Sequence, residues 1–90
     1  MLQFDWDPSK AESNAAKHGI LFSEAATAFG DPLSLTIADR DHSLGEARFI
    51  LVGVTYVGRL IVVAHAESDD TIRIISARPA TAAERRYYEQ

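Results

Sequence analysis

The chain has 90 residues, no cysteine and a formal net charge of −4, and 47% of its residues are hydrophobic. This length predicts a single domain over residues 1–90, and the apolar content argues against a disordered chain. The lack of cysteine excludes a disulfide framework and a thiolate metal site. No apolar run approaches the ~20 residues of a membrane-spanning helix, and the start MLQFDWDPSK lacks a signal-peptide pattern. We therefore expect a cytoplasmic protein with no membrane partner.

The charge is distributed unevenly along the chain. Residues 1–47 carry eight acidic and three basic side chains, whereas residues 48–90 carry five acidic and six basic ones, and all six are arginine. This asymmetry indicates a polarised surface with local affinity for anions. Arginine outnumbers lysine seven to two, which favours phosphate recognition because the guanidinium fork matches phosphate oxygens.

The first third of the chain is predicted to hold a short strand and two helices. Residues 4–6 fit a strand, and the Asp-Pro pair at 7–8 predicts an N-cap followed by proline at the first helical position. That helix is expected to end at Gly19 as a left-handed C-cap. Ser23 is a candidate N-cap for a second helix, which ends at the Gly-Asp-Pro run at 30–32.

The remainder of the chain predicts a meander of strands and a final helix. Thr81 and Glu84 form a T-x-x-E capping box that opens the helix. The element order indicates an α+β fold, with a small antiparallel sheet of about four strands plus a short N-terminal strand, and helices packed on one face. The four predicted strands, which are rich in valine and isoleucine and joined by short connections, are 33–39, 47–56, 59–67 and 71–78.

The last predicted strand carries two arginines of interest. Under strict alternation Arg73 lies opposite the isoleucines, so it projects from the open face if helices cover the isoleucine side. Arg78 alternates to the other side, but at the strand's end it can extend to either rim. Both can equally be surface arginines paired with Glu67 or Asp70. The strand alone leaves these interpretations open.

The final helix adds further candidates. Glu84 can serve as a general base, although its capping-box position explains it without chemistry. Tyr88 can stack on a base or transfer a proton, or it can simply cover the sheet. Arg85 is one turn from Tyr88. Arg86 and Tyr87 fit a framework or solvated role.

The three histidines lie in separate elements. His18 follows Lys17 at the end of the first helix, where the pair either stabilises the helix dipole or approaches a phosphate. His42 lies in a loop with two aspartates, a weak metal pattern. His65 lies in a strand and is either buried or on the open side. No histidine metal motif and no Gly-rich phosphate loop is present in the sequence, so we expect no metal and no cofactor.

Three stretches of the chain together resemble the BrnT family of toxins. The first is FDWDPSKAESNAAKHGILFSEAATAFGDP, with an aromatic-Trp-Asp start, a helix that ends in Lys-His-Gly, and a Phe-x-Glu-Ala-Ala segment. The second is RFILVGVTYVGRLIVVAHAE, with its Arg-Phe entry and Gly-Arg-Leu turn. The third is IRIISARPATAAERRYYEQ, a closing strand followed by Glu-Arg-x-x-Tyr. The resemblance covers essentially the whole chain in one order.

The resemblance implies a RelE-like fold and a type II toxin that cleaves RNA and inhibits translation. It also implies a BrnA-type ribbon-helix-helix antitoxin that neutralises the toxin and represses their operon. Operator DNA is then bound only through the antitoxin, in a complex of two toxins and an antitoxin dimer. The family motif covers Lys17, His18, Arg48, Arg59, Arg73, Arg78, Glu84, Arg85 and Tyr88.

A metal-independent cleavage is the mechanism that these groups suggest. The ribose 2′-OH attacks the adjacent phosphate, which requires a base, cations around the phosphorane and an acid for the leaving oxygen. The alternative is a module without catalysis that binds a partner and acts only in a repressor complex. Our hypothesis gives phosphate stabilisation to Arg73 and Arg78, with Arg48 or Arg59 in support, proton transfer to His65, Tyr88 or Glu84, and RNA binding to Lys17, His18, Arg48, Arg59 and Arg85.

Overall fold

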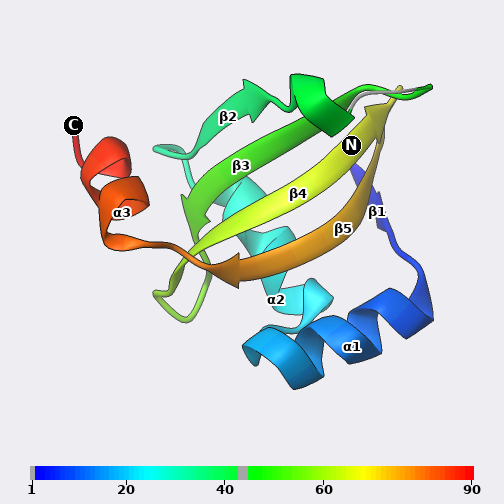
Figure 1. Ribbon diagram of the computed structural model, residues 1–90, viewed down its shortest axis with the longest axis horizontal. Coiled ribbons are helices and arrows are strands. Elements are labelled where there is room, and N and C mark those ends of the chain that lie inside the picture. The colour runs from blue at the N-terminus through cyan, green and yellow to red at the C-terminus, as the bar shows by residue number, and fades with distance from the viewer. Residues whose placement is uncertain (1, 43–44) are drawn as a thin grey trace.

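The structure is a computed structural model that describes residues 2–42 and 45–90 (Figure 1). Within them five strands form one sheet in the order β1-β5-β4-β3-β2, and three α-helices accompany it. The predicted α+β class is confirmed. The helices are α1 (Pro8–His18), α2 (Phe22–Thr27) and α3 (Ala82–Tyr88), the short 3₁₀ turns are η1 (Ala28–Gly30) and η2 (Arg40–His42), and the strands are β1 (Gln3–Asp5), β2 (Leu35–Ala38), β3 (Arg48–Val54), β4 (Leu60–Ser68) and β5 (Thr71–Pro79).

The sheet is an antiparallel meander with one parallel strand added at its edge. Strands β2 to β5 pair with their neighbours in sequence, as the short connections predict. Strand β1 pairs in parallel with β5, so that Asp5 lies opposite Arg73. The sequence predicts β1 as a strand but not this pairing, because nothing local in three residues specifies a partner that lies far along the chain.

The predicted caps of α1 and α3 are confirmed. The Asp7 carboxylate accepts the Ser9 N–H at 2.9 Å, and Gly19 closes α1 with a φ of 70°. Thr81 and Glu84 form the reciprocal capping box of α3, with bonds of 3.2 and 2.8 Å. These local signals work because each satisfies N–H groups that the first helical turn leaves without partners.

The predicted start of α2 at Ser23 is wrong. The helix begins at Phe22, its N-cap is Leu21, and no side chain caps it. Phe22 is almost completely buried, as is Ile20 just before the helix. Burial of this phenylalanine therefore decides where the helix starts, and tertiary packing overrides the capping preference of serine.

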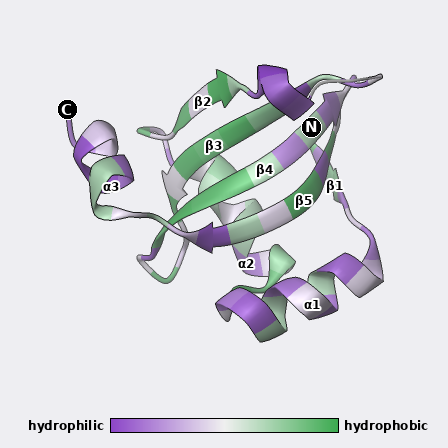
Figure 2. Cartoon of the chain, viewed as in Figure 1, coloured by the Kyte–Doolittle hydropathy of each residue, from purple (hydrophilic) through white to green (hydrophobic). Residues whose placement is uncertain are grey.

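Helices α1 and α2 cover one face of the sheet. Figure 2 shows that β3 and β4 are mostly hydrophobic, whereas α1 is mostly hydrophilic. The main core lies between this face and the helices. Its buried residues are Ile20, Phe22, Ala25, Ala28, Leu51, Ile61, Val63, Ile72, Ile74 and Ala77.

Helix α3 packs at the end of the opposite face, whereas the sequence predicted helices on one face only. A smaller cluster of Val52, Leu60 and Val62 lies on this second face, and Tyr88 and Ala80 pack against it. These valines and leucine alternate with core residues along β3 and β4, so they need a cover of their own. The rest of this face carries no α-helix among the described residues (Figure 1), and we call it the open face. No helix in the described parts of the chain is long and apolar enough to cross a membrane.

Candidate nucleic-acid interface

A β-bulge at Ile75 places Arg73 and Arg78 on the same face of the sheet. Ala64 pairs with Ser76 and His65 pairs with Ile74, so the register skips one residue of β5. Residues directly opposite in a sheet share a face. Arg78 lies opposite Val62, on the open face, and the register gives the same face to Arg73. Strict alternation predicted opposite sides, and the extra residue cancels that difference.

A third arginine, Arg48, belongs to the same face. Arg48 and Arg73 both lie opposite Ala66, one on each side of β4. They are two strand spacings apart, roughly 10 Å. Arg73 and Arg78 are separated along β5 by roughly 13 Å at about 3.3 Å per paired residue. The open face therefore presents cations over a length that suits an extended anion better than a single small ion.

Glu46 joins two of these cations. The Arg73 Nη2 donates to Glu46 Oε1, and Arg48 Nε lies 3.5 Å from the same oxygen. The carboxylate stands beside a groove of about 540 Å³ that Asp5 and Glu67 also line. Sequence reasoning missed Glu46. The available signal was its position two residues before Arg48, close enough for the two side chains to pair.

Arg78 is held by Glu84 in a bidentate ion pair. Arg78 Nη1 donates to Glu84 Oε1 and Nη2 to Oε2, each at 2.8 Å. This pairing, together with the capping bonds of Thr81, lowers the pKa of Glu84 from 4.5 to about 2 and raises that of Arg78. Glu84 is thus ionised at neutral pH and already has two structural duties. A carboxylate of such low pKa is a weak base.

Tyr88 is anchored on the open-face side by Asp31. Its hydroxyl donates to Asp31 Oδ2 at 2.6 Å, and the same oxygen accepts the Val54 N–H at 2.9 Å. The hydrogen bond to the Asp31 carboxylate raises the pKa of Tyr88. The phenol therefore stays protonated near neutral pH and holds α3 to the sheet.

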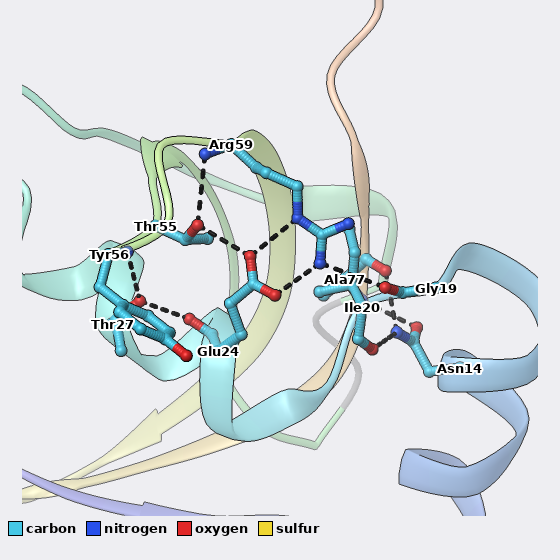
Figure 3. A network of polar contacts seen from close by, with 9 residues as sticks. All are labelled: Asn14, Gly19, Ile20, Glu24, Thr27, Thr55, Tyr56, Arg59 and Ala77. Atoms are coloured by element: carbon cyan, nitrogen blue, oxygen red, sulfur yellow. Dashed lines mark hydrogen bonds and ion pairs between the residues drawn. The ribbon is translucent and has the colours of Figure 1, made fainter.

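Arg59 lies apart from the open-face arginines. Its Nε and Nη2 donate to the two Glu24 oxygens at 2.9 and 2.5 Å, and Nη2 also reaches the Gly19 carbonyl at 3.1 Å. The Thr55 hydroxyl donates to Glu24 as well, at 2.8 Å (Figure 3). Arg59 thus joins the β3–β4 turn to the corner between α1 and α2, which is a structural arrangement.

His65 lies in the core, on the helix-covered face. It is fully buried, and its ring meets Phe29 edge-on at 4.8 Å and stacks near Phe49 at 5.8 Å. Its Nε2 lies 2.9 Å from Glu67 Oε2. The sequence left open whether this histidine is buried or on the open side, and the structure gives the first answer. In this conformation His65 does not share a surface with the arginines.

The other predicted RNA-binding residues lie at the margins. Lys17 and His18 occupy the last turn of α1 and line a groove of about 350 Å³ together with Lys10 and Ser76. This groove borders β5 beyond its short pairing with β1. Arg85 is exposed on α3, next to Glu84 in the chain. The structure therefore brings Arg48, Arg73 and Arg78 onto one face and leaves the remaining predicted cations around it.

A histidine–aspartate pair stands near Arg48. His42 Nδ1 lies 3.1 and 3.0 Å from the two Asp39 oxygens, and the Asp39 N–H donates to the Arg48 carbonyl at 2.8 Å. Sequence reasoning considered His42 only as a weak metal ligand. Within residues 2–42 and 45–90, no three histidine, aspartate or glutamate side chains gather closely enough to hold a metal ion.

The fold is similar to that of a protein of known structure. The chain matches a crystal structure of the Brucella abortus ribonuclease toxin BrnT with a TM-score of 0.71 over 90% of this chain and 99% of that one, at 20% sequence identity. This likeness shows a shared fold, that of a small ribonuclease toxin. No curated protein matches the sequence.

The family follows from the sequence itself. Residues 6–84 match the model of the family described as ribonuclease toxin, BrnT, of type II toxin-antitoxin system. The chain therefore belongs to the BrnT family, and the predicted resemblance is confirmed. It is a ribonuclease toxin of a type II system, and such a system includes an antitoxin partner.

Proposed function

We propose that this chain cleaves RNA on its open face without a metal ion, by attack of a ribose 2′-OH on the adjacent phosphate. The observation that carries the proposal is the common face of Arg48, Arg73 and Arg78. Cleavage of this kind builds negative charge on the phosphorane oxygens. Three guanidinium groups on one solvent-facing sheet surface are suited to stabilise that charge.

Carboxylates hold these cations in place while RNA is absent. Glu46 contacts Arg48 and Arg73, and Glu84 grips Arg78 with two bonds. An incoming phosphate joins or replaces these partners, so the guanidinium groups are oriented before the substrate arrives. Loss of one phosphate-stabilising donor is expected to raise the barrier by about 2–4 kcal/mol, by analogy with removal of one oxyanion donor.

The marginal cations extend the contact with RNA. Lys17 and His18 border the free part of β5, and Arg85 is exposed on α3. We assign them to flanking phosphates, whose contacts are electrostatic and weaken with salt. Of the predicted proton-transfer groups, Glu84 and Tyr88 lie on the open-face side, whereas His65 is enclosed on the other.

The consequence in the cell is inhibition of translation in the cytoplasm, relieved by a ribbon-helix-helix antitoxin of the BrnA type. The acidic character of residues 1–47, with eight acidic against three basic side chains, supports steering of a partner with basic segments. A complex of two toxins with an antitoxin dimer would bring the toxin to operator DNA only through the antitoxin.

The test is cleavage of RNA by the purified protein in excess EDTA. We expect cleavage to persist, and Arg73→Ala and Arg78→Ala each to lose about 10²–10³-fold in rate. The control is Arg86→Ala, which removes an exposed arginine of α3 that belongs to neither ion pair described above. All variants are compared at equal folded fraction from circular dichroism. Full activity in both Arg73→Ala and Arg78→Ala would contradict the assignment of the site.

A second candidate function is a partner-binding module without catalysis, active only within a repressor complex. The observation that favours it is the pairing of Arg73 and Arg78 with carboxylates of the same chain. Arginines whose charge is already neutralised in this way can be purely structural and need not bind RNA. The same assay separates the two functions. Intact RNA in the presence of well-folded protein that still binds its antitoxin would favour the module.

A further inference from the structure

The end of the open face farthest from α3 carries two titratable groups that have not been assigned a part in the cleavage reaction. They are Glu46, which follows the turn between β2 and β3, and His42, which closes η2. Each is fixed to the sheet by its own contacts: Glu46 through Arg73, and His42 through Asp39. Glu46 therefore contacts the cation pair Arg48 and Arg73 directly, and His42 is linked to it through Asp39, whose N–H donates to the Arg48 carbonyl.

Glu46 has the setting of a general base. Its carboxylate contacts Arg48 and Arg73, the groups proposed to bind phosphate, so a phosphate seated on them lies next to this carboxylate. The side chain is 39% exposed and borders the groove of about 540 Å³, which leaves room for a ribose. Unlike Glu84, it caps no helix. The other charged groups lining its groove are Asp5, Glu67 and Arg73.

His42 has the setting of a general acid. Nδ1 meets both oxygens of Asp39, so the imidazolium donates that proton to the carboxylate and keeps Nε2–H for a substrate. The ring is 66% exposed, and Asp39 is the less exposed partner. Its remaining charged neighbours in η2 are Arg40 and Asp41. A carboxylate that orients a histidine through Nδ1 is the arrangement that fixes its tautomer in acid–base catalysis.

We propose that Glu46 is the general base and His42 the general acid of RNA cleavage, with Asp39 as the positioning residue of His42. This inference rests on the proposed ribonuclease function. Glu46 takes the proton of the 2′-OH as the 2′-oxygen bonds to phosphorus. The bond from phosphorus to the 5′-oxygen then breaks, and His42 Nε2 gives its proton to that oxygen. The products are a 2′,3′-cyclic phosphate and a 5′-hydroxyl, and no water or metal is consumed.

Glu46 and His42 are better placed for proton transfer than the candidates predicted from the sequence. Glu84 has a pKa of about 2 and is engaged with Arg78, His65 is enclosed among aromatic rings, and the Tyr88 hydroxyl is committed to Asp31. Glu46 is itself paired with Arg73 and Arg48, but it caps no helix and borders a groove. His42 is 66% exposed, so both side chains are accessible to a bound substrate.

The test uses two substrates that differ only in how much they need an acid. One is a dinucleotide, whose leaving group is a 5′-alkoxide, and the other is uridine 3′-(4-nitrophenyl phosphate), whose nitrophenolate leaves without protonation. Glu46→Gln is expected to lose about 10²–10⁴-fold in kcat on both substrates. His42→Gln is expected to lose as much on the dinucleotide, but less than tenfold on the nitrophenyl ester. The matched control is Glu12→Gln, on the exposed surface of α1.

The pH–rate profile supplies the second measurement. The wild type is expected to give a bell, from which Glu46→Gln removes the acid limb and His42→Gln the alkaline limb. Asp39→Asn is expected to lower kcat about tenfold, leave KM unchanged and move the alkaline limb. A variant that merely misfolds would lower activity on both substrates without changing the shape of the profile.

The outcomes separate this inference from the proposed function. A wild type that cleaves neither substrate overturns both. A wild type that cleaves RNA while Glu46→Gln and His42→Gln keep more than a tenth of its activity overturns only the assignment of base and acid. Equal losses of His42→Gln on the two substrates would also overturn it, because a group that acts only through structure does not distinguish leaving groups.

Discussion

The two faces of the sheet differ in how their polar groups are satisfied. On the helix-covered face, Asn14 donates to the carbonyls of Ile20 and Ala77. Arg59 donates to the Gly19 carbonyl and to the carboxylate of Glu24, whose side chain is only 11% exposed. On the open face, Arg73 and Arg78 bond to carboxylates carried by a turn and by a short terminal helix. An internal partner cannot be exchanged without loss of the fold, whereas a partner on the rim can give way to a phosphate.

The role of an ion pair thus depends on the other groups that its two side chains bind. The Arg59–Glu24 pair and the Arg78–Glu84 pair are both bidentate. Arg59 also binds the Gly19 carbonyl, so its pair fixes the route of the chain. Substitutions on the helix-covered face should therefore lower stability without changing the chemistry, whereas substitution of the open-face arginines should affect RNA cleavage more than stability.

The largest loss of stability should come from truncating a buried side chain on the helix-covered face. Phe22 is almost fully buried and packs edge-on against Trp6 at 5.9 Å. Phe22→Ala is therefore expected to reduce the free energy of unfolding by about 3–5 kcal/mol, measured by urea denaturation. The contrasting variant is Ile37→Ala, on the edge strand β2 at 52% exposure, which should stay within about 0.5 kcal/mol. A comparable cost at Ile37 would mean that the two faces are equally packed.

The next largest loss of stability concerns the side-chain amide of Asn14, which binds backbone groups of β5. The Asn14 Nδ2 donates to the carbonyls of Ile20 and Ala77, and its oxygen accepts the Ala77 N–H, with distances of 2.9–3.0 Å (Figure 3). Asn14→Ala leaves these buried backbone groups without partners and should cost about 3 kcal/mol. The measurement is again urea denaturation, with Ser13→Ala, on the exposed side of α1, as control. A loss below about 1 kcal/mol would show that water replaces the amide.

Local chemistry in the sequence accounts for much of the fold. Asp7, Gly19 and the capping box at Thr81 place helix ends because each answers a backbone need within a few residues. The strands follow from alternation and branching. The start of α2 and the side of the sheet taken by α3 do not follow, since burial of Phe22 and of the Val52 cluster is decided by distant segments.

The candidate site shows the same division. Arg73 and Arg78 are recognisable as phosphate ligands by residue type, yet their common face depends on a bulge at Ile75. A bulge is invisible in the pattern because one extra residue in a strand looks like ordinary alternation. Glu46 was missed for a related reason, because its partner Arg73 is brought near by the sheet and not by spacing along the chain. The His42–Asp39 pair is local, three residues apart, but was considered only as a weak metal pattern.

A smaller effect should appear as acid sensitivity of the open face. Glu84 has a pKa of about 2 in the folded chain against 4.5 unfolded, because Arg78 donates two bonds to its carboxylate. A depressed pKa stabilises the fold above pH 4.5, and that contribution is lost as the pH falls towards 2. With the side chain 28% exposed, we expect about 2 kcal/mol after allowance for solvent screening.

The measurement is unfolding free energy against pH for the wild type and Glu84→Gln. The variant should be less stable at pH 7 and should show a flatter decline between pH 4.5 and 2. Glu12→Gln on the exposed surface of α1 serves as control and should keep the wild-type slope. Parallel curves for wild type and Glu84→Gln would contradict the ion pair in solution.

The smallest effect tests whether Tyr88 belongs to structure or to chemistry. Tyr88→Phe removes the 2.6 Å bond to Asp31 but keeps the ring against Val52 and Leu60. Asp31 retains the N–H groups of Val54 and Leu33, so the loss of stability should be about 1 kcal/mol. Cleavage per folded molecule should fall less than tenfold, because the hydroxyl is occupied. A fall of more than 100-fold at unchanged stability would instead make the phenol a proton donor, and the open face would then hold its chemistry at the α3 end and not beside Arg48.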